Sequence, residues 1–211
     1  MSQEYPRIIA FCGTKGSGKT TAAHRLRRFL SPSSALIQFC EIVNFAHPLK
    51  QISLATGFTY EELYGLQKET PSPSLGITAR EFLQDLGDFF RIHLPQHYPN
   101  WLQGSGEKFT TYMMRERIKS SKAQWVLVDD VRYPDEYQML QEFGAKVCYI
   151  ERSGGDKKFS DHSSEQKVKE FSDDLERIEN NGTLDEFFGK VDKILLNMMG
   201  SFPTRSGEGC F

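Results

Sequence analysis

One segment near the amino end constrains the fold most, because its spacing G-x-x-x-x-G-K-[ST] is that of a phosphate-binding loop: Gly13-Thr14-Lys15-Gly16-Ser17-Gly18-Lys19-Thr20. A short apolar run, residues 7–12, precedes it, and a helical pattern, residues 21–30, follows it. Glycines allow the sharp turn that points backbone N–H groups at an anion, and the following helix adds the positive end of its dipole. The segment therefore predicts a loop that binds the phosphates of a nucleoside triphosphate.

Individual residues of this loop have expected roles. Lys19 would reach the β- and γ-phosphates of ATP, and the Thr20 hydroxyl would hold Mg²⁺. A glycine-rich turn without a ligand is the weaker alternative, because such a turn does not require the Lys-Thr pair. The residues expected to bind the nucleotide are Gly13, Lys15, Gly16, Ser17, Gly18, Lys19, Thr20 and Thr21.

Length and composition limit the class of protein. The chain has 211 residues, which suits one domain with inserted lobes, and a formal net charge of -2, which provides no basic field for nucleic acid or an anionic membrane. No cationic apolar leader is visible, and no apolar run approaches the ~18 residues of a membrane span, so we expect a cytoplasmic protein. The four cysteines are far apart, which disfavours zinc and disulfides.

Apolar runs that alternate with helical stretches predict an α/β fold with a parallel sheet covered on both faces. The segment after the last strand, Asn180-Asn181-Gly182-Thr183, reads as a turn and helix cap before a helix over residues 184–199. The expected strands are residues 8–12, 35–40, 125–129, 146–151 and 177–179.

The same pattern predicts a single domain over residues 1–200, with a flexible tail over 201–211. Its parts are a core over 7–40 and 122–199, a helical insertion over 41–121 that would grip a substrate, and a lid over 152–172. The lid contains two glycines beside two lysines, as expected of a mobile cationic flap, and His162 within it suits a capping or hinge role.

Acidic residues end the third expected strand, next to the phosphate-binding loop. Because adjacent strand residues point to opposite faces, one of the pair should face the metal, with Asp130 the first choice and Asp129 the second. Arg132 follows them and would offer its guanidinium to a phosphate oxygen. The alternatives are a polar strand end without a catalytic role, and an Arg132 that pairs with Asp135 or Glu136.

The helical insertion carries a second candidate cluster. Arg80, Gln84, Gly87 and Arg91 have spacings of four, three and four, so they share one face of a helix expected over residues 78–93. That face could bind an anion and a base edge, or it could be the solvated side of an ordinary amphipathic helix. Lys50 could bind phosphate, or it could be a solvated surface lysine. Phe45, Tyr98 and Trp101 could stack on a base, or they could pack in the core.

Six segments in this order resemble the phage-type deoxynucleoside monophosphate kinases of the P-loop nucleotide kinase group. The resemblance runs from Arg7 to about Met199, with two departures: His47 stands where the family usually has Asp, and Tyr133-Pro134-Asp135-Glu136 varies the usual Phe-Pro-Asn-Glu. The segments are residues 13–21, 45–50, 80–87, 130–136, 161–165 and 178–182.

This resemblance implies a five-stranded parallel sheet of order 2-3-1-4-5, a helical monophosphate-binding lobe and a lid. It implies ATP- and Mg²⁺-dependent phosphorylation of deoxynucleoside monophosphates, with small molecules as the only expected partners and a homodimer as one option. The resemblance would place Lys50, Arg80, Gln84 and Arg132 around the acceptor, and Arg152 with the lysines of the flap over the ATP phosphates. Together with the residues singled out above, the expected catalytic residues are Lys19, Arg132, Asp130 and Arg152, the metal ligands are Thr20 and Asp130, and the acceptor-binding residues are Lys50, Arg80, Gln84, Arg91, Trp101 and Arg132. A kinase of phosphomevalonate or dephospho-coenzyme A, and a nucleotide-dependent switch, are the alternatives.

Overall fold

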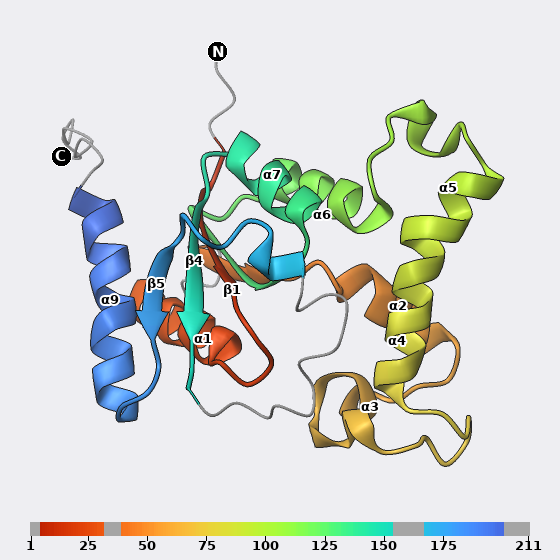
Figure 1. Cartoon of the computed structure of the whole chain (residues 1–211), viewed down its shortest axis with the longest axis horizontal. Coiled ribbons are helices and arrows are strands. Elements are labelled where there is room, and N and C mark those ends of the chain that lie inside the picture. The colour runs from red at the N-terminus through yellow and green to blue at the C-terminus, as the bar shows by residue number, and fades with distance from the viewer. Residues whose placement is uncertain (1–4, 32–38, 154–166, 201–211) are drawn as a thin grey trace, which may run out of the picture.

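A five-stranded parallel sheet of order β2-β3-β1-β4-β5 forms the centre of the computed structural model, which describes residues 5–31, 39–153 and 167–200 (Figure 1). Every neighbouring pair of strands is parallel, and the strand order is the one implied by the resemblance, so the predicted fold class is confirmed. The strands are β1 (Arg7–Cys12), β2 (Cys40–Val43), β3 (Trp125–Val131), β4 (Lys146–Glu151) and β5 (Glu176–Glu179).

Helices cover both faces of the sheet. On β1, Ile9 and Phe11 pack in a core with α1 (Lys19–Leu30) and α9 (Leu184–Gly200). The alternate residues of β1 pack in a second core with α6 (Phe109–Ser120) and α7 (Pro134–Glu142), because successive side chains of a strand point to opposite faces. The two cores hold the carboxyl ends of the central strands rigidly beside the loop between β1 and α1.

Among the described residues, the second strand overlaps its predicted segment only at Cys40. It spans Cys40–Val43 and begins at the last residue of the segment predicted as a strand, residues 35–40, of which 35–38 lie outside the described residues. The pairing of Cys40 with Trp125 and of Val43 with Val128 sets this register, since it buries both residues against β3. The strand therefore continues three residues beyond its predicted segment, into the range predicted as the helical insertion.

A lobe of short helices lies between β2 and β3 in the sequence and beside the sheet in space (Figure 1). It has a small core of its own, formed by Phe58, Leu63 and Ala79. The helix predicted over residues 78–93 begins one residue later and passes into a π-helical turn. The elements of the lobe are α2 (His47–Ala55), α3 (Tyr60–Tyr64), η2 (Leu66–Glu69), α4 (Ala79–Asp88), η3 (Phe89–His93), α5 (Leu94–His97) and η4 (Trp101–Gly104).

Two predicted segments are partly or wholly outside the described residues. They are residues 154–166 of the proposed lid, which include His162, and the proposed tail over 201–211. The division into core, insertion, lid and tail remains a proposal. None of the helices in the described part of the chain has the length and apolar character needed to cross a membrane.

Candidate active site

The loop between β1 and α1 adopts a conformation that requires glycine at two positions. Gly13 has φ of 136°, and a Cβ there would lie 2.3 Å from the carbonyl oxygen of Ile150. Gly18 has φ of 111°, and a Cβ there would lie 2.7 Å from Asn180 Nδ2. Both values belong to the region that side chains disfavour, so these glycines let the loop turn tightly against β4 and the β5–α9 loop.

This loop fits a phosphate chain. Gly18 is the N-cap of α1 and provides no side-chain cap, so the first amides of the helix remain available to an anion. Lys19 Nζ donates to the carbonyl oxygens of Gly13, at 2.8 Å, and Thr14, at 2.7 Å, which holds the ammonium over the loop. Asn180 Nδ2 supports the loop from behind by donating to the Ser17 carbonyl at 2.7 Å.

The acidic pair at the end of β3 divides into two roles. Thr20 Oγ1 donates a 2.7 Å hydrogen bond to Asp129 Oδ2, whereas the Asp130 carboxylate accepts the backbone N–H groups of Phe45 at 2.9 Å and Ala46 at 3.0 Å. Burial and the charge of Asp129 raise the pKa of Asp130 to about 6. This geometry favours Asp129, the second choice from sequence, as the metal-side carboxylate. Thr20 and Asp129 fit Mg²⁺, which prefers oxygen ligands and keeps part of its shell for phosphate and water.

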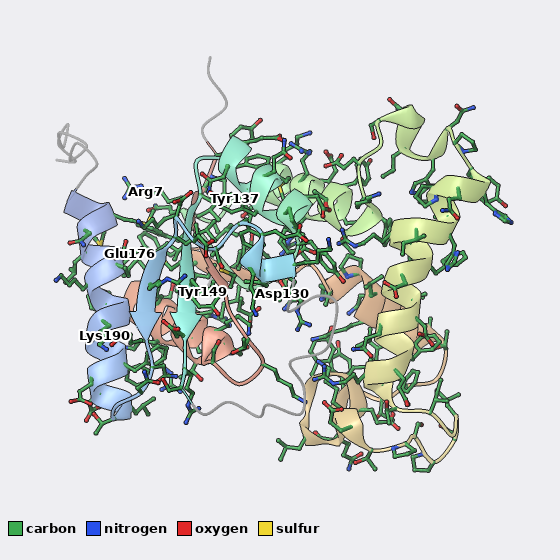
Figure 2. All side chains as sticks on the ribbon, viewed as in Figure 1. Arg7, Asp130, Tyr137, Tyr149, Glu176 and Lys190 are labelled. Carbon is green, nitrogen blue, oxygen red and sulfur yellow. The ribbon has the colours of Figure 1, made fainter. Side chains whose placement is uncertain are left out.

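An irregularity in strand pairing explains why both carboxylates reach the same place. The β1–β3 register steps from Ala10↔Val128 to Cys12↔Val131, so β3 contains one extra residue at this point. Such a bulge interrupts the alternation of side chains between the two faces. Asp129 and Asp130 consequently line the same pocket, and Figure 2 shows Asp130 on the side of the sheet that faces the helical lobe.

Two adjoining pockets lie between the loop and the helical lobe. We call the first the phosphate pocket; its lining includes Gly13, Gly16, Lys19, Thr20, Asp129 and Asp130. We call the second the acceptor pocket; its lining includes Phe45, Leu49, Leu83, Gly87, Arg91 and Tyr133. The residues that line both are Ala46, Lys50, Lys68, Arg80, Gln84, Asp130 and Arg132. The structure thus brings four of the predicted acceptor residues, Lys50, Arg80, Gln84 and Arg132, to the junction of the pockets.

The shared cations are held by different parts of the chain. Lys50 on α2 is buried, its Nζ lies 4.1 Å from the centre of the Tyr64 ring, and burial lowers its pKa despite the nearby Asp130. Arg132 is held through its backbone, because its N–H donates to Glu136 Oε2 at 2.8 Å, and its side chain is exposed. The expected alternative, in which the Arg132 guanidinium pairs with Asp135 or Glu136, does not occur within the described residues.

Arg91 makes those ion pairs instead. Its guanidinium donates to both carboxylate oxygens of Asp135, at 2.8 and 2.9 Å, and lies 3.3 Å from Glu136 Oε1. It also stacks on the Tyr133 ring, with 3.7 Å from Cζ to the ring centre. Arg91 therefore forms a rigid wall of the acceptor pocket. Its predicted contact with an acceptor stays a prediction, and the guanidinium already pairs with Asp135 and Glu136.

Glu69 connects the phosphate-binding loop with α4. Its Oε1 lies 2.8 Å from Lys15 Nζ in the phosphate-binding loop and also accepts from Arg80 Nε on α4. All three side chains are partly exposed, so the pairs contribute little stability, but they hold one cation from each side of the junction.

Trp101 is not part of this cluster. It lies on η4 and lines a separate surface pocket with Leu94 and Tyr98. Its ring centre is 6.4 Å from that of Phe109, which itself stacks on Phe90. The aromatic cluster packs the indole away from the acceptor pocket, so the structure does not bring Trp101 together with the other predicted acceptor residues, and its stacking on a base stays a prediction.

A third pocket lies on the outer side of the loop. Gly18, Thr21, Arg152 and Asn180 line it, and Arg152 Nη1 donates to the Gly16 carbonyl at 3.3 Å. Gly16, Lys19 and Thr20 line this pocket as well as the phosphate pocket. A nucleotide bound along the loop could therefore extend from one pocket into the other.

Lys68 and Glu69 had no assigned role from sequence, and Asn180 was expected only in a turn and helix cap. Asn180 follows an expected strand and belongs to a segment of the family resemblance, and these two features could have indicated that it lies at the site. Lys68 and Glu69 lie in a short irregular stretch with no recognisable spacing.

A family model described as deoxynucleotide monophosphate kinase matches residues 59–191, more than half of the chain. No curated protein sequence matches the chain. Among solved structures, a mutant of the APS kinase CysC from Mycobacterium tuberculosis has a TM-score of 0.46 and 13% identity, covering 91% of this chain and 98% of its own. The structure of a protein called APE1195 has a TM-score of 0.42 and 15% identity, covering 95% and 98%.

Proposed function

Because the chain belongs to the deoxynucleotide monophosphate kinase family, we propose that it transfers the γ-phosphoryl group of ATP, with Mg²⁺, to the phosphate of a deoxynucleoside monophosphate. One observation supports this reaction above all. The phosphate pocket and the acceptor pocket meet at a shared set of side chains that includes Lys50, Arg80 and Arg132. Two phosphate groups that meet at such a junction would have their negative charge neutralised there.

On the donor side, the loop would bind the phosphates of ATP. The amides at the start of α1 and the Lys19 ammonium face the same pocket, and Arg152 lies beside Gly16 on the outer side. Mg²⁺, held by Thr20 and Asp129, would supply neutralisation of the phosphate oxygens.

On the acceptor side, Arg80 and Gln84 lie one turn apart on α4, and Phe45 and Leu49 add apolar surface. Gln84 carries both a donor and an acceptor group, so it suits the edge of a base, and apolar side chains suit the faces of its ring. Arg91 and Tyr133 close the pocket as a stacked pair. These residues would orient the monophosphate with its phosphate toward the junction.

The transfer itself needs no protein nucleophile. An oxygen of the acceptor phosphate forms a bond to the γ-phosphorus while the bond from that phosphorus to the β-γ bridging oxygen breaks, and ADP leaves. The side chains contribute alignment of the two substrates and stabilisation of the charge on the transferred group. Lys19 and Arg132, one from each side of the junction, are positioned for that stabilisation.

A coupled assay of ADP release tests this proposal over all common deoxy- and ribonucleoside monophosphates, phosphomevalonate and dephospho-coenzyme A. We expect little ADP without an acceptor and rapid release with at least one deoxynucleoside monophosphate. Release that is equally fast without any acceptor would indicate a switch or simple ATPase. Turnover only with phosphomevalonate or dephospho-coenzyme A would assign the acceptor pocket to that substrate. A cytoplasmic setting and a homodimer remain predictions from the sequence.

A further inference from the structure

Lys68 takes an unusual position in the short helix η2. Its neighbour Leu66 is 96% exposed, whereas Lys68 is half-buried and lines both the phosphate pocket and the acceptor pocket. A short surface helix would ordinarily bury its leucine and expose its lysine, because removing the charged ammonium from water costs free energy. The inward lysine therefore needs a partner that compensates for its partial loss of water.

The protein does not supply that partner within its described residues. Over residues 5–31, 39–153 and 167–200, Lys68 makes no hydrogen bond or ion pair. The neighbouring carboxylate of Glu69 is engaged with Lys15 and Arg80. Asp130 on β3 attracts the Lys68 charge, but its carboxylate accepts two backbone N–H groups and makes no hydrogen bond with Lys68 within the described residues.

The other charged groups around Lys68 repel it. They come from three different elements: Lys50 on α2, Arg80 on α4 and Arg132 after β3. Burial, together with these cations, lowers the pKa of Lys68 to about 8, and Asp130 opposes the shift only in part. A half-buried cluster of like charges such as this one becomes favourable when an anion enters it.

We infer that Lys68 binds the acceptor phosphate at the junction of the two pockets and stays bound to it as the phosphoryl group is transferred. This inference rests on the proposed kinase function and adds a substrate-contacting residue to it. Lys68 would keep its proton throughout and act by hydrogen bonding and charge. It is suited to this position because it lines the acceptor pocket and the phosphate pocket alike.

Steady-state kinetics of Lys68→Met, Lys68→Arg and the wild-type chain test the inference, with Gln67→Met as a matched control in the same helical turn. Methionine keeps an unbranched side chain of nearly the same length and removes the charge. We expect Lys68→Met to raise KM for the deoxynucleoside monophosphate by about tenfold or more, with KM for ATP changed less than about twofold. Gln67 is exposed and lines neither pocket, so Gln67→Met should leave both constants unchanged.

Two further readouts separate binding from a structural role. In the wild type, kcat/KM for the acceptor should fall as the pH rises through about 8, where Lys68 loses its proton, and Lys68→Arg should move that fall to higher pH because arginine stays charged. Thermal unfolding of Lys68→Met without ligands should occur at the wild-type temperature or above, since a repelled cation is removed.

The inference is overturned if Lys68→Met keeps the wild-type KM for the acceptor, or if it raises both Michaelis constants equally while lowering the unfolding temperature. Those results would leave the kinase function standing as long as the wild type shows acceptor-dependent ADP release. A wild type without acceptor-dependent release would instead overturn the kinase function, and the role of Lys68 with it.

Discussion

Thr20 Oγ1 lies 2.7 Å from Asp129 Oδ2, which joins the first turn of α1 to the carboxyl end of β3. The two residues are 109 positions apart in the sequence. Their hydrogen bond brings a hydroxyl and a carboxylate to the edge of the sheet where the phosphate-binding loop begins. Asp130, the next residue, is occupied by the backbone amides that lead into α2.

This division predicts different effects for the two asparagine substitutions. Asp129→Asn should raise the Mg²⁺ concentration needed for half-maximal activity by about tenfold or more, because it removes a charge beside the metal. Asp130→Asn should instead raise KM for the monophosphate, since an amide cannot accept both N–H groups and α2 carries Lys50. Mg²⁺ titrations and acceptor kinetics of both variants provide the comparison. The same Mg²⁺ shift in both would contradict the assignment of Asp129.

Lys19→Ala should abolish most phosphoryl transfer while the fold stays intact. The half-buried Lys19 ammonium donates to the Gly13 and Thr14 carbonyls of the loop, and its loss removes charge stabilisation from the transferred group, worth about 10²-fold or more in kcat. Circular dichroism and ADP release would be measured together, with Lys193→Ala on the exposed side of α9 as the control. Activity near the wild-type level in Lys19→Ala would remove the loop from the mechanism.

Arg80→Ala and Gln84→Ala should raise KM for the monophosphate by about tenfold while KM for ATP changes much less, because both residues lie on α4 at the acceptor pocket. Asp85→Ala is the matched control, since Asp85 is exposed on the same helix and lines neither pocket. If all three variants behaved alike, this face of α4 would be an ordinary solvated surface.

Arg152→Ala should lower kcat more than it weakens ATP binding. Arg152 is exposed and donates a 3.3 Å hydrogen bond to the Gly16 carbonyl, so we expect its guanidinium to contact the phosphates mainly as the phosphoryl group is transferred. Calorimetric binding of ATP and single-turnover rates would separate the two effects. A loss of ATP affinity as large as the loss of rate would mean that Arg152 acts in ground-state binding.

Much of the core and part of the site could be predicted from local patterns. Alternating strand and helix signals and the glycine spacing of the loop depend on neighbours in the sequence, and β1, β3, β4 and α1 lie within about two residues of their expected positions. The edge strand β2 extends to Val43, beyond its predicted end at Cys40, because its position depends on pairing with β3, which a short apolar run does not specify.

The choice between Asp129 and Asp130 shows what only the tertiary structure decides. Alternation along a strand predicts that one of them faces the metal, but the extra residue of β3 opposite β1 suspends that alternation and brings both to the same pocket. Trp101 and Lys68 show the same dependence on packing. An aromatic cluster holds Trp101 away from the acceptor pocket, and the fold of the lobe turns Lys68 into it.

The sequence by itself determined the spacing of the phosphate-binding loop and the α/β class, because spacing and periodicity are properties of neighbouring residues, and the resemblance of six segments indicated the family. The tertiary structure decided that Asp129 accepts the Thr20 hydroxyl and that Lys50, Lys68 and Arg80 line the same pocket as Arg132. It also decided that Trp101 lines a different pocket. These outcomes depend on where side chains from distant segments point after the sheet and the lobe have packed, and sequence spacing does not encode that direction.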